Sequence, residues 1–289
     1  MDSFKRMNNF NLHKLLGVFG VFIFIFSLVI VFFTNYSYFY TFFLLGSWFI
    51  LDYINFSLTK KSILNSLLIK KNRHFIFFIL IINAISAFLV DYVYGVKIVG
   101  MWEWNNYGVF QWIIMLVFMT LLFCFVVYET YCFFYVFLSK EFREKLKVRI
   151  GKRFERIILY LGFIMLILPL LNYLFLKNFY PNYFLIFAFI GIWFITEGVT
   201  NYFGGKTLLI KILNGDKKVI FSIIFSTFFL AFVHEFINFF AKEWAYVNAP
   251  FHEISLYGVP ISILLGWFPL VIFCISVVNL IKTVINKNK

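Results

Sequence analysis

Acidic side chains stand within or beside long apolar runs of this 289-residue chain, at places where a charge is costly. A charged side chain at the centre of a bilayer costs at least about 2.5 kcal/mol on insertion scales, so such residues usually face a cavity or a partner group. We therefore expect the chemistry of the protein among eight of its thirteen acids, which are Asp52, Asp91, Glu103, Glu129, Glu197, Glu235, Glu243 and Glu253.

One group of acids is expected toward the outer face of a membrane, with aromatic residues between them. Glu103 stands between Trp102 and Trp104, and Glu243 directly precedes Trp244. This pattern places carboxyl groups beside aromatic faces at one depth. The alternative is an interfacial aromatic belt, in which the rings only anchor the helices. The full outer group is Asp91, Glu103, Glu235, Glu243, Glu253, His234 and His252, with Trp102, Trp104, Trp244 and Tyr246.

A second group, formed by Asp52, Glu129 and Glu197, is expected toward the cytoplasmic face. We place these three residues among the candidate substrate-binding residues. The alternative is that they are hydrogen-bonded carboxyl groups that fix the packing of helices. The sequence leaves both interpretations open.

Metal and thiol chemistry have weaker signals. His234-Glu235 begins like the zinc motif His-Glu-x-x-His, but position 238 is Asn238 and the second ligand is missing. A metal site that uses His234 with His252 stays open as an alternative. The three cysteines have no paired spacing, so we predict neither a disulfide framework nor a thiolate metal site. No metal and no cofactor is predicted.

The composition places these residues in a polytopic membrane protein. Hydrophobic residues make up 63% of the chain, charged residues 13%, and the mean hydropathy is +0.90, which is far from the soluble range. Because a bilayer core requires about 20 apolar residues per helix, we predict an all-α fold with about eight transmembrane helices. Their expected ranges are 16–34, 37–57, 75–94, 107–138, 157–176, 183–203, 219–241 and 257–281.

The basic residues predict the orientation of these helices. Under the eight-helix topology only Lys97, Lys177 and Lys242 of the 26 Lys and Arg residues fall on one side of the membrane. The basic side is expected to be cytoplasmic, so we predict a multi-pass protein of the cell membrane with both termini in the cytoplasm. Basic residues that flank apolar spans favour anionic lipid headgroups over nucleic acid as partners.

Two halves of the sequence repeat each other. Gly46 to Asp52 reads like Gly191 to Glu197, and Tyr107-Gly108-Val109 reads like Tyr257-Gly258-Val259. We predict one four-helix repeat over 1–139, a basic cytoplasmic linker over 140–156 and a second repeat over 157–289. Because each unit has an even number of helices, the copies run parallel about an axis along the membrane normal, and a substrate would bind between them.

Two stretches of the chain resemble the lycopene cyclase domain of membrane carotenoid enzymes. The first combines Asp91 with Gly100-Met-Trp102-Glu-Trp104-Asn105 and Tyr128-Glu129. The second combines Glu235 with Glu243-Trp244-Ala-Tyr246, Ala249-Pro250 and Gly258-Val-Pro260. The family's Pro-x-Glu-Glu signature is absent from both halves.

The resemblance implies a membrane-embedded enzyme that modifies an isoprenoid or carotenoid by acid-initiated cyclase or hydratase chemistry. It implies a lipophilic small-molecule substrate, whose double bond a carboxylic acid protonates and whose carbocation aromatic faces stabilise. The implied proton donors and bases are Asp91, Glu103, Glu235 and Glu243, with His234 as a relay, and the implied cation stabilisers are Trp102, Trp104, Trp244 and Tyr246.

Three other interpretations remain open from the residues alone. Parallel repeats with acids at two depths fit a proton-coupled transporter or a lipid-translocating protein, which requires a polar cavity linking Asp52 and Glu197 to the outer acids. A metal-dependent membrane hydrolase would use His234, Glu235, His252 and Glu253. A structural membrane protein would have no chemistry of its own. The sequence does not indicate the oligomeric state.

Overall fold

The computed structural model confirms an all-α membrane protein. It describes residues 2–33, 39–64, 81, 82, 84–86, 88–105, 109–138, 152–175 and 181–287. Within these residues, seven helices are long and apolar enough to cross a bilayer. These helices are α1 (Asp2–Phe33), α2 (Phe39–Thr59), α5 (Val109–Phe137), α6 (Lys152–Phe175), α7 (Pro181–Tyr202), α9 (Lys217–Ala241) and α10 (Ile261–Lys287).

The seven helices correspond to seven of the eight predicted spans. The remaining prediction, 75–94, lies partly outside the described residues, and the predicted linker at 140–156 lies mostly outside them. The described end of the third span belongs to a π-helix, η1 (Phe88–Val99), which continues past the predicted boundary. The last span begins at Ile261 instead of 257, because the residues before it form short strands.

Four short strands, none of them predicted, cover one end of the helices. β1 (Trp102–Trp104) pairs antiparallel with β2 (Trp244–Tyr246), so that Glu103 lies opposite Ala245. β3 (Ser255–Leu256) and β4 (Val259–Pro260) form a hairpin just before α10. The two residues of its turn, Tyr257 and Gly258, have φ angles of 51° and 78°, as tight two-residue hairpin turns require.

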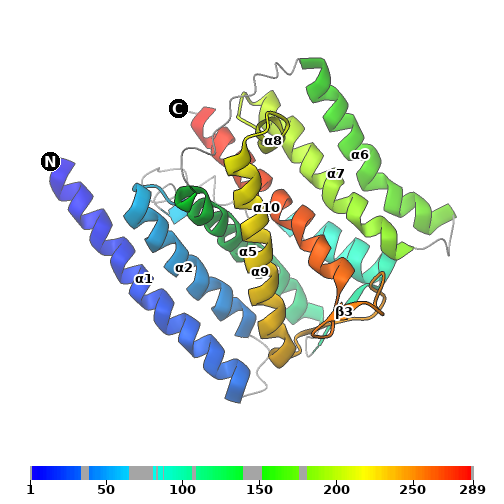
Figure 1. The fold of residues 1–289 in the computed structure, drawn as a ribbon, viewed down its shortest axis with the longest axis horizontal. Coiled ribbons are helices and arrows are strands. Elements are labelled where there is room, and N and C mark those ends of the chain that lie inside the picture. Colours follow the sequence, from blue (N-terminus) through cyan, green and yellow to red (C-terminus); the bar gives the residue numbers. More distant parts are fainter. Residues whose placement is uncertain are drawn as a thin grey trace.

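Two helix pairs form the flanks of the molecule. α1 packs on α2 at one side and α6 packs on α7 at the other, with α5, α9 and α10 between them (Figure 1). Each pair crosses at facing glycines. A Cβ atom on Gly46 would lie 2.6 Å from the backbone N of Phe24, and one on Gly191 would lie 2.7 Å from the backbone N of Leu166. Small residues of this kind let membrane helices approach closely, so backbone packing holds both pairs together.

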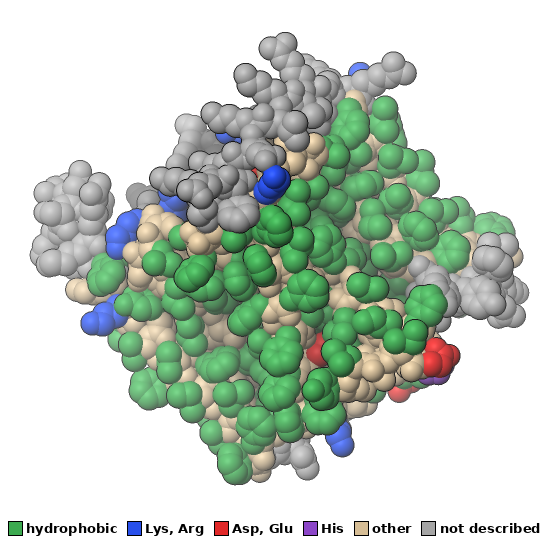
Figure 2. Space-filling model, viewed as in Figure 1, with side chains coloured by type: hydrophobic (Ala, Val, Ile, Leu, Met, Phe, Trp, Pro, Cys, Tyr) green, Lys and Arg blue, Asp and Glu red, His purple; other side chains and the backbone are tan. Residues whose placement is uncertain are grey.

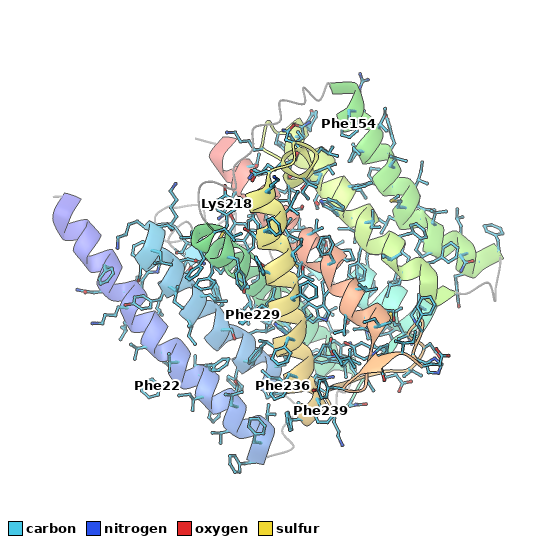
Figure 3. The ribbon with its side chains drawn as sticks, viewed as in Figure 1. Phe22, Phe154, Lys218, Phe229, Phe236 and Phe239 are labelled. Atoms are coloured by element: carbon cyan, nitrogen blue, oxygen red, sulfur yellow. The ribbon has the colours of Figure 1, made fainter. Side chains whose placement is uncertain are left out.

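The outer surface is apolar, as a lipid-facing surface must be. α1 and α6 are the least buried of the seven spans and α10 is the most buried. Hydrophobic side chains cover most of the face seen in Figure 2. Phe22 on α1 and Phe236 and Phe239 on α9 are among the large side chains exposed on the outside (Figure 3). Seven apolar helices with this surface describe a multi-pass membrane protein.

We expect the Gly46→Val substitution to separate α1 from α2, because the new side chain meets backbone atoms of α1 that cannot move aside. Overpacking of this kind costs about 1–3 kcal/mol, so the thermal unfolding midpoint in detergent should fall. Gly266→Ala is the control, since a Cβ atom there meets nothing within 4 Å. Equal midpoints for Gly46→Val and Gly266→Ala would show that the close crossing does not matter.

Candidate functional site

A cavity of about 430 Å³ lies beneath the β1–β2 pair. Residues of both halves line it, from α2, η1, β1 and α5 in the first half and from α7, α9, β2 and α10 in the second. Nearly all of its lining is apolar or aromatic. Two carboxyl groups, those of Asp91 and Glu235, belong to the lining. A largely apolar cavity with a few convergent polar groups is the usual form of a small-molecule site.

Asp91 is held by two indoles. It lies on η1, and its Oδ1 accepts a hydrogen bond of 2.7 Å from Trp102 Nε1 while its Oδ2 accepts one of 3.1 Å from Trp104 Nε1. Gly95, one turn further along η1, makes room for the first indole, because a Cβ atom there would lie 2.2 Å from Trp102 Cζ2. Both carboxyl oxygens therefore have a donor, and the paired donors suit an anion.

Glu235 has the same kind of partners on only one of its oxygens. Its Oε1 accepts hydrogen bonds of 2.7 Å from Tyr246 OH and 2.9 Å from Trp267 Nε1. Its Oε2 is buried without a hydrogen-bond partner among the described residues. A buried carboxyl oxygen without a partner is costly as an anion, and a protonated oxygen has a proton to donate.

His234 lies beside this carboxyl group in an aromatic setting. Its Nδ1 is 2.5 Å from Tyr40 OH, and both side chains are buried. The rings of Phe43, Phe123 and Trp267 surround the imidazole at centroid distances of 5.1 to 5.5 Å. Tyr40 lines the cavity, so it connects the histidine with the space a substrate would fill.

The other two candidate carboxyl groups lie outside the cavity lining. Glu103 is exposed on β1. Glu243 is buried just after α9, and its backbone N donates a hydrogen bond of 3.0 Å to Asn238 Oδ1. Burial raises the pKa of the Glu243 carboxyl to about 9. This residue is therefore protonated at neutral pH.

The four aromatic residues predicted to bind substrate all line the cavity. The rings of Trp104 and Trp244 lie 5.6 Å apart between centroids, and Trp244 also contacts Tyr40 at 5.1 Å. Trp244 Nε1 donates to Tyr246 OH, which in turn donates to Glu235. The site thus combines π faces with donors that point at the two carboxyl groups.

Asp52 and Glu129 lie together in a different cluster, away from the cavity lining. His13 Nδ1 lies 2.9 Å from Asp52 Oδ2. The backbone N–H of Leu64 donates to Asp52 Oδ1, and that of Ile63 donates to Glu129 Oε1. Both carboxyl groups therefore tie the segment after α2 to the helix bundle.

Glu197 ties the segment after α7 to the helix bundle in the same way, in the second half of the chain. Its Oε2 accepts a hydrogen bond of 2.8 Å from the backbone N–H of Leu209, which lies in the short helix α8 (Leu208–Leu213). Its Oε1 accepts one of 2.6 Å from Ser276 Oγ on α10. Glu197 is also absent from the cavity lining. The geometry of Asp52, Glu129 and Glu197 fits the packing interpretation.

The residues considered for a metal site do not gather in the structure. His252 and Glu253 lie 3.4 Å apart with 71% of each side chain exposed, whereas His234 is buried. Within the described ranges, no group of three His, Cys, Asp or Glu side chains could hold a metal ion.

The structure also adds residues that sequence reasoning missed. Tyr40 and Trp267 both line the cavity, and His13 pairs with Asp52. Trp267 lies in an apolar run and Tyr40 lies in the run Tyr38-Phe39-Tyr40-Thr41, and neither has an acid or a histidine close by in the sequence. The sequence could have indicated these residues only through their polar O–H and N–H groups, because a buried phenol or indole needs a hydrogen-bond partner.

The raised pKa of Glu243 predicts how stability depends on pH. In the unfolded chain the Glu243 carboxyl has its ordinary pKa of 4.5, so above pH 4.5 only the folded protein keeps the proton. The free energy of unfolding therefore falls as the pH rises from 4.5 toward about 9. We expect the unfolding midpoint to fall over this range, and to fall less for Glu243→Gln. Thermal unfolding at a series of pH values measures this. The exposed Glu103→Gln is the control, and a profile for Glu243→Gln that matches the wild type would contradict the assignment.

Comparisons with known proteins give no relative. The chain matches no family model, no curated protein and no solved structure. The cavity, its two carboxyl groups and its aromatic lining are therefore the features that bear on function.

Proposed function

We propose that this protein is a membrane-embedded enzyme that protonates a double bond of an isoprenoid or carotenoid and so starts a cyclisation or a hydration. The observation that carries the proposal is Glu235, whose Oε2 has no hydrogen-bond partner in the described part of the chain and which lines an apolar, aromatic cavity. In such a place the carboxylic acid is surrounded mainly by apolar and aromatic groups, which are poor acceptors of its proton. The proton acceptor is then a double bond of the substrate, although an alkene is only a weak base.

In the proposed reaction Glu235 is the general acid. The π electrons of the double bond take the proton from Oε2, a C–H bond forms, and the neighbouring carbon becomes a carbocation. Glu235 is left as a carboxylate, which Tyr246 OH and Trp267 N–H stabilise through their bonds to Oε1. The faces of Trp104 and Trp244 are the candidate cation stabilisers.

Asp91 is the proposed base. Its two indole donors favour the carboxylate, which can accept a proton from a carbon beside the cation. If a second double bond of the substrate attacks the cation, a ring forms and the charge moves to another carbon. Loss of a proton from a carbon beside the new cation to Asp91 then completes an isomerisation. If water adds instead, its proton goes to Asp91 and the product is an alcohol. After either route Glu235 is a carboxylate and Asp91 carries a proton. Transfer of that proton from Asp91 to Glu235 then restores both groups for the next turnover.

A transporter is less well supported. That function requires a polar path between the inner and outer acids, but Asp52, Glu129 and Glu197 are bonded to backbone and side-chain donors outside the cavity lining. A metal-dependent hydrolase is also less well supported, since His252 is exposed and His234 is bonded to Tyr40.

We also infer that the two halves are copies related by an axis along the membrane normal. Contacts that recur in both halves support this. Asn105 Nδ2 donates to the carbonyl of Lys242, and Asn248 Nδ2 donates to the carbonyl of Gly100, each at 2.9 Å. Gly100 and Lys242 both have left-handed backbone angles, with φ of 60° and 50°.

The centre of the molecule supports the same axis. The β1–β2 register sets Glu103 opposite Ala245. On either side of that pair, Trp102 lies opposite Tyr246 and Trp104 lies opposite Trp244, as a two-fold axis through the central pair requires. Cys124 on α5 and Cys274 on α10 are separated by the same 150 positions as Tyr107 and Tyr257, and their sulfur atoms lie 3.5 Å apart. Side chains at equivalent positions that touch each other lie on a two-fold axis. The cavity then lies between the two copies.

The orientation of the helices is proposed from the charge pattern, with both termini in the cytoplasm of the cell. We expect alkaline phosphatase fused after Lys289 to be inactive and green fluorescent protein at the same place to fluoresce. Fusions after Phe251, in the loop between α9 and α10, should give the opposite pair of results. Active phosphatase at Lys289 would reverse the topology.

The proposed chemistry predicts that Glu235→Gln abolishes product formation, because an amide cannot supply the proton. The measurement is mass spectrometry of lipids from cells that express each variant together with an isoprenoid-producing pathway. The wild type should yield a cyclised or hydrated polyene that is missing from cells without it. Removal of a general acid typically costs 10²–10⁴-fold in rate.

Glu103→Gln is the matched control, since this carboxyl group is exposed on β1 and should leave product levels unchanged. Each variant is also checked for membrane insertion and for its unfolding midpoint. Identical lipids in cells with and without the wild-type protein would count against the enzyme and lead to transport assays.

A further inference from the structure

We propose that the substrate enters the cavity sideways from the bilayer, through an opening between α7 and α10 at Gly266. This inference rests on the proposed function for the identity of the substrate, an isoprenoid chain. The opening itself is a feature of the cavity wall, and its test does not require turnover.

Part of the cavity wall is also outer surface. Ile186 on α7 and Leu265 on α10 both line the cavity, yet 45% and 68% of their surfaces are exposed. Both residues lie within membrane spans, Phe184–Tyr202 and Ile261–Val284, close to the first residue of each. Exposed apolar surface at that position faces lipid hydrocarbon rather than water. The cavity therefore communicates with the bilayer near one membrane face.

Gly266 marks the gap in the wall. A Cβ atom added to this residue would meet no heavy atom within 4 Å, although Gly266 lines the cavity. Its backbone lies in α10 and its φ angle is not in the left-handed region, so the fold does not require glycine there. A glycine inside a helix costs roughly 0.5–1 kcal/mol relative to alanine. The position thus leaves space at a small cost in helix stability.

The other half of the protein fills the corresponding place. The spacing that aligns Tyr107-Gly108 with Tyr257-Gly258 aligns Leu116 on α5 with Gly266 on α10. Leu116 also lines the cavity, but it is only 7% exposed. A leucine therefore closes the wall in the first half where a glycine leaves it open in the second. The difference gives the cavity one lateral opening at these two positions.

The local backbone and the lining fit an apolar occupant. Pro269, one turn after Leu265, has no N–H to donate to the carbonyl of Leu265, so the helix turn that contains Gly266 has one backbone bond fewer. Leu185, Phe189 and Ile263 continue the apolar surface inward from the opening. An isoprenoid chain dissolved in the bilayer can pass this surface without leaving an apolar environment.

The test measures contact between bilayer chains and the cavity tryptophans. The purified full-length protein is placed in vesicles of phosphatidylcholine or of phosphatidylcholine with brominated acyl chains, which quench tryptophan emission on contact. Trp102, Trp104, Trp244 and Trp267 line the cavity. We compare the wild type with Gly266→Leu, which copies Leu116, and with Gly266→Ala, which adds one methyl group into open space.

We expect brominated lipid to quench the wild type and Gly266→Ala to the same extent, and Gly266→Leu to lose a clear part of that quenching. Equal quenching of all three would overturn the opening. Ile186→Phe closes the gap from α7 and serves as a second variant with the same expected loss. Glu235→Gln should be quenched like the wild type, so loss of the chemistry and loss of the opening are separate results.

Discussion

The fold depends on one constraint, that a carboxyl group inside a membrane must have hydrogen-bond donors or keep its proton. Asp91 and Glu235 meet it with indole and phenol donors that come from the β1–β2 pair and from α10. These bonds fix the strands over the helices, and the strands join the two halves. Trp102 and Trp104 of β1 and Tyr246 of β2, which cover the cavity, are therefore held there by their hydrogen bonds to the two carboxyl groups.

The same constraint is met differently at the opposite ends of the helices. There Asp52, Glu129 and Glu197 accept hydrogen bonds from backbone N–H groups of the segments that follow α2 and α7. Donors on the main chain hold these segments in place, and none of the three carboxyl groups lines the cavity. Asp52, Glu129 and Glu197 thus support the architecture, whereas Asp91 and Glu235 lie among the aromatic rings of the cavity.

Hydropathy predicted most of the helices because the bilayer imposes a length and a composition on each of them. It could not predict the four strands, since a three-residue segment such as Trp102–Trp104 has too little pattern to distinguish from a loop. Nor could it predict that Glu103 is exposed while Glu235 faces a cavity. That difference arises from tertiary contacts, above all from Tyr246 and Trp267, which lie 11 and 32 residues from Glu235 in the sequence.

Glu235 as a proton-bearing acid in a dry cavity is the central claim. The infrared spectrum of the protein in vesicles at neutral pH tests it most directly, because protonated carboxyl groups absorb in a C=O stretching region free of amide bands. The difference between the wild type and Glu235→Gln should contain a protonated carboxyl band that shifts in D₂O. A difference spectrum that contains only carboxylate bands would contradict the account, since an anion at Glu235 has no proton to give.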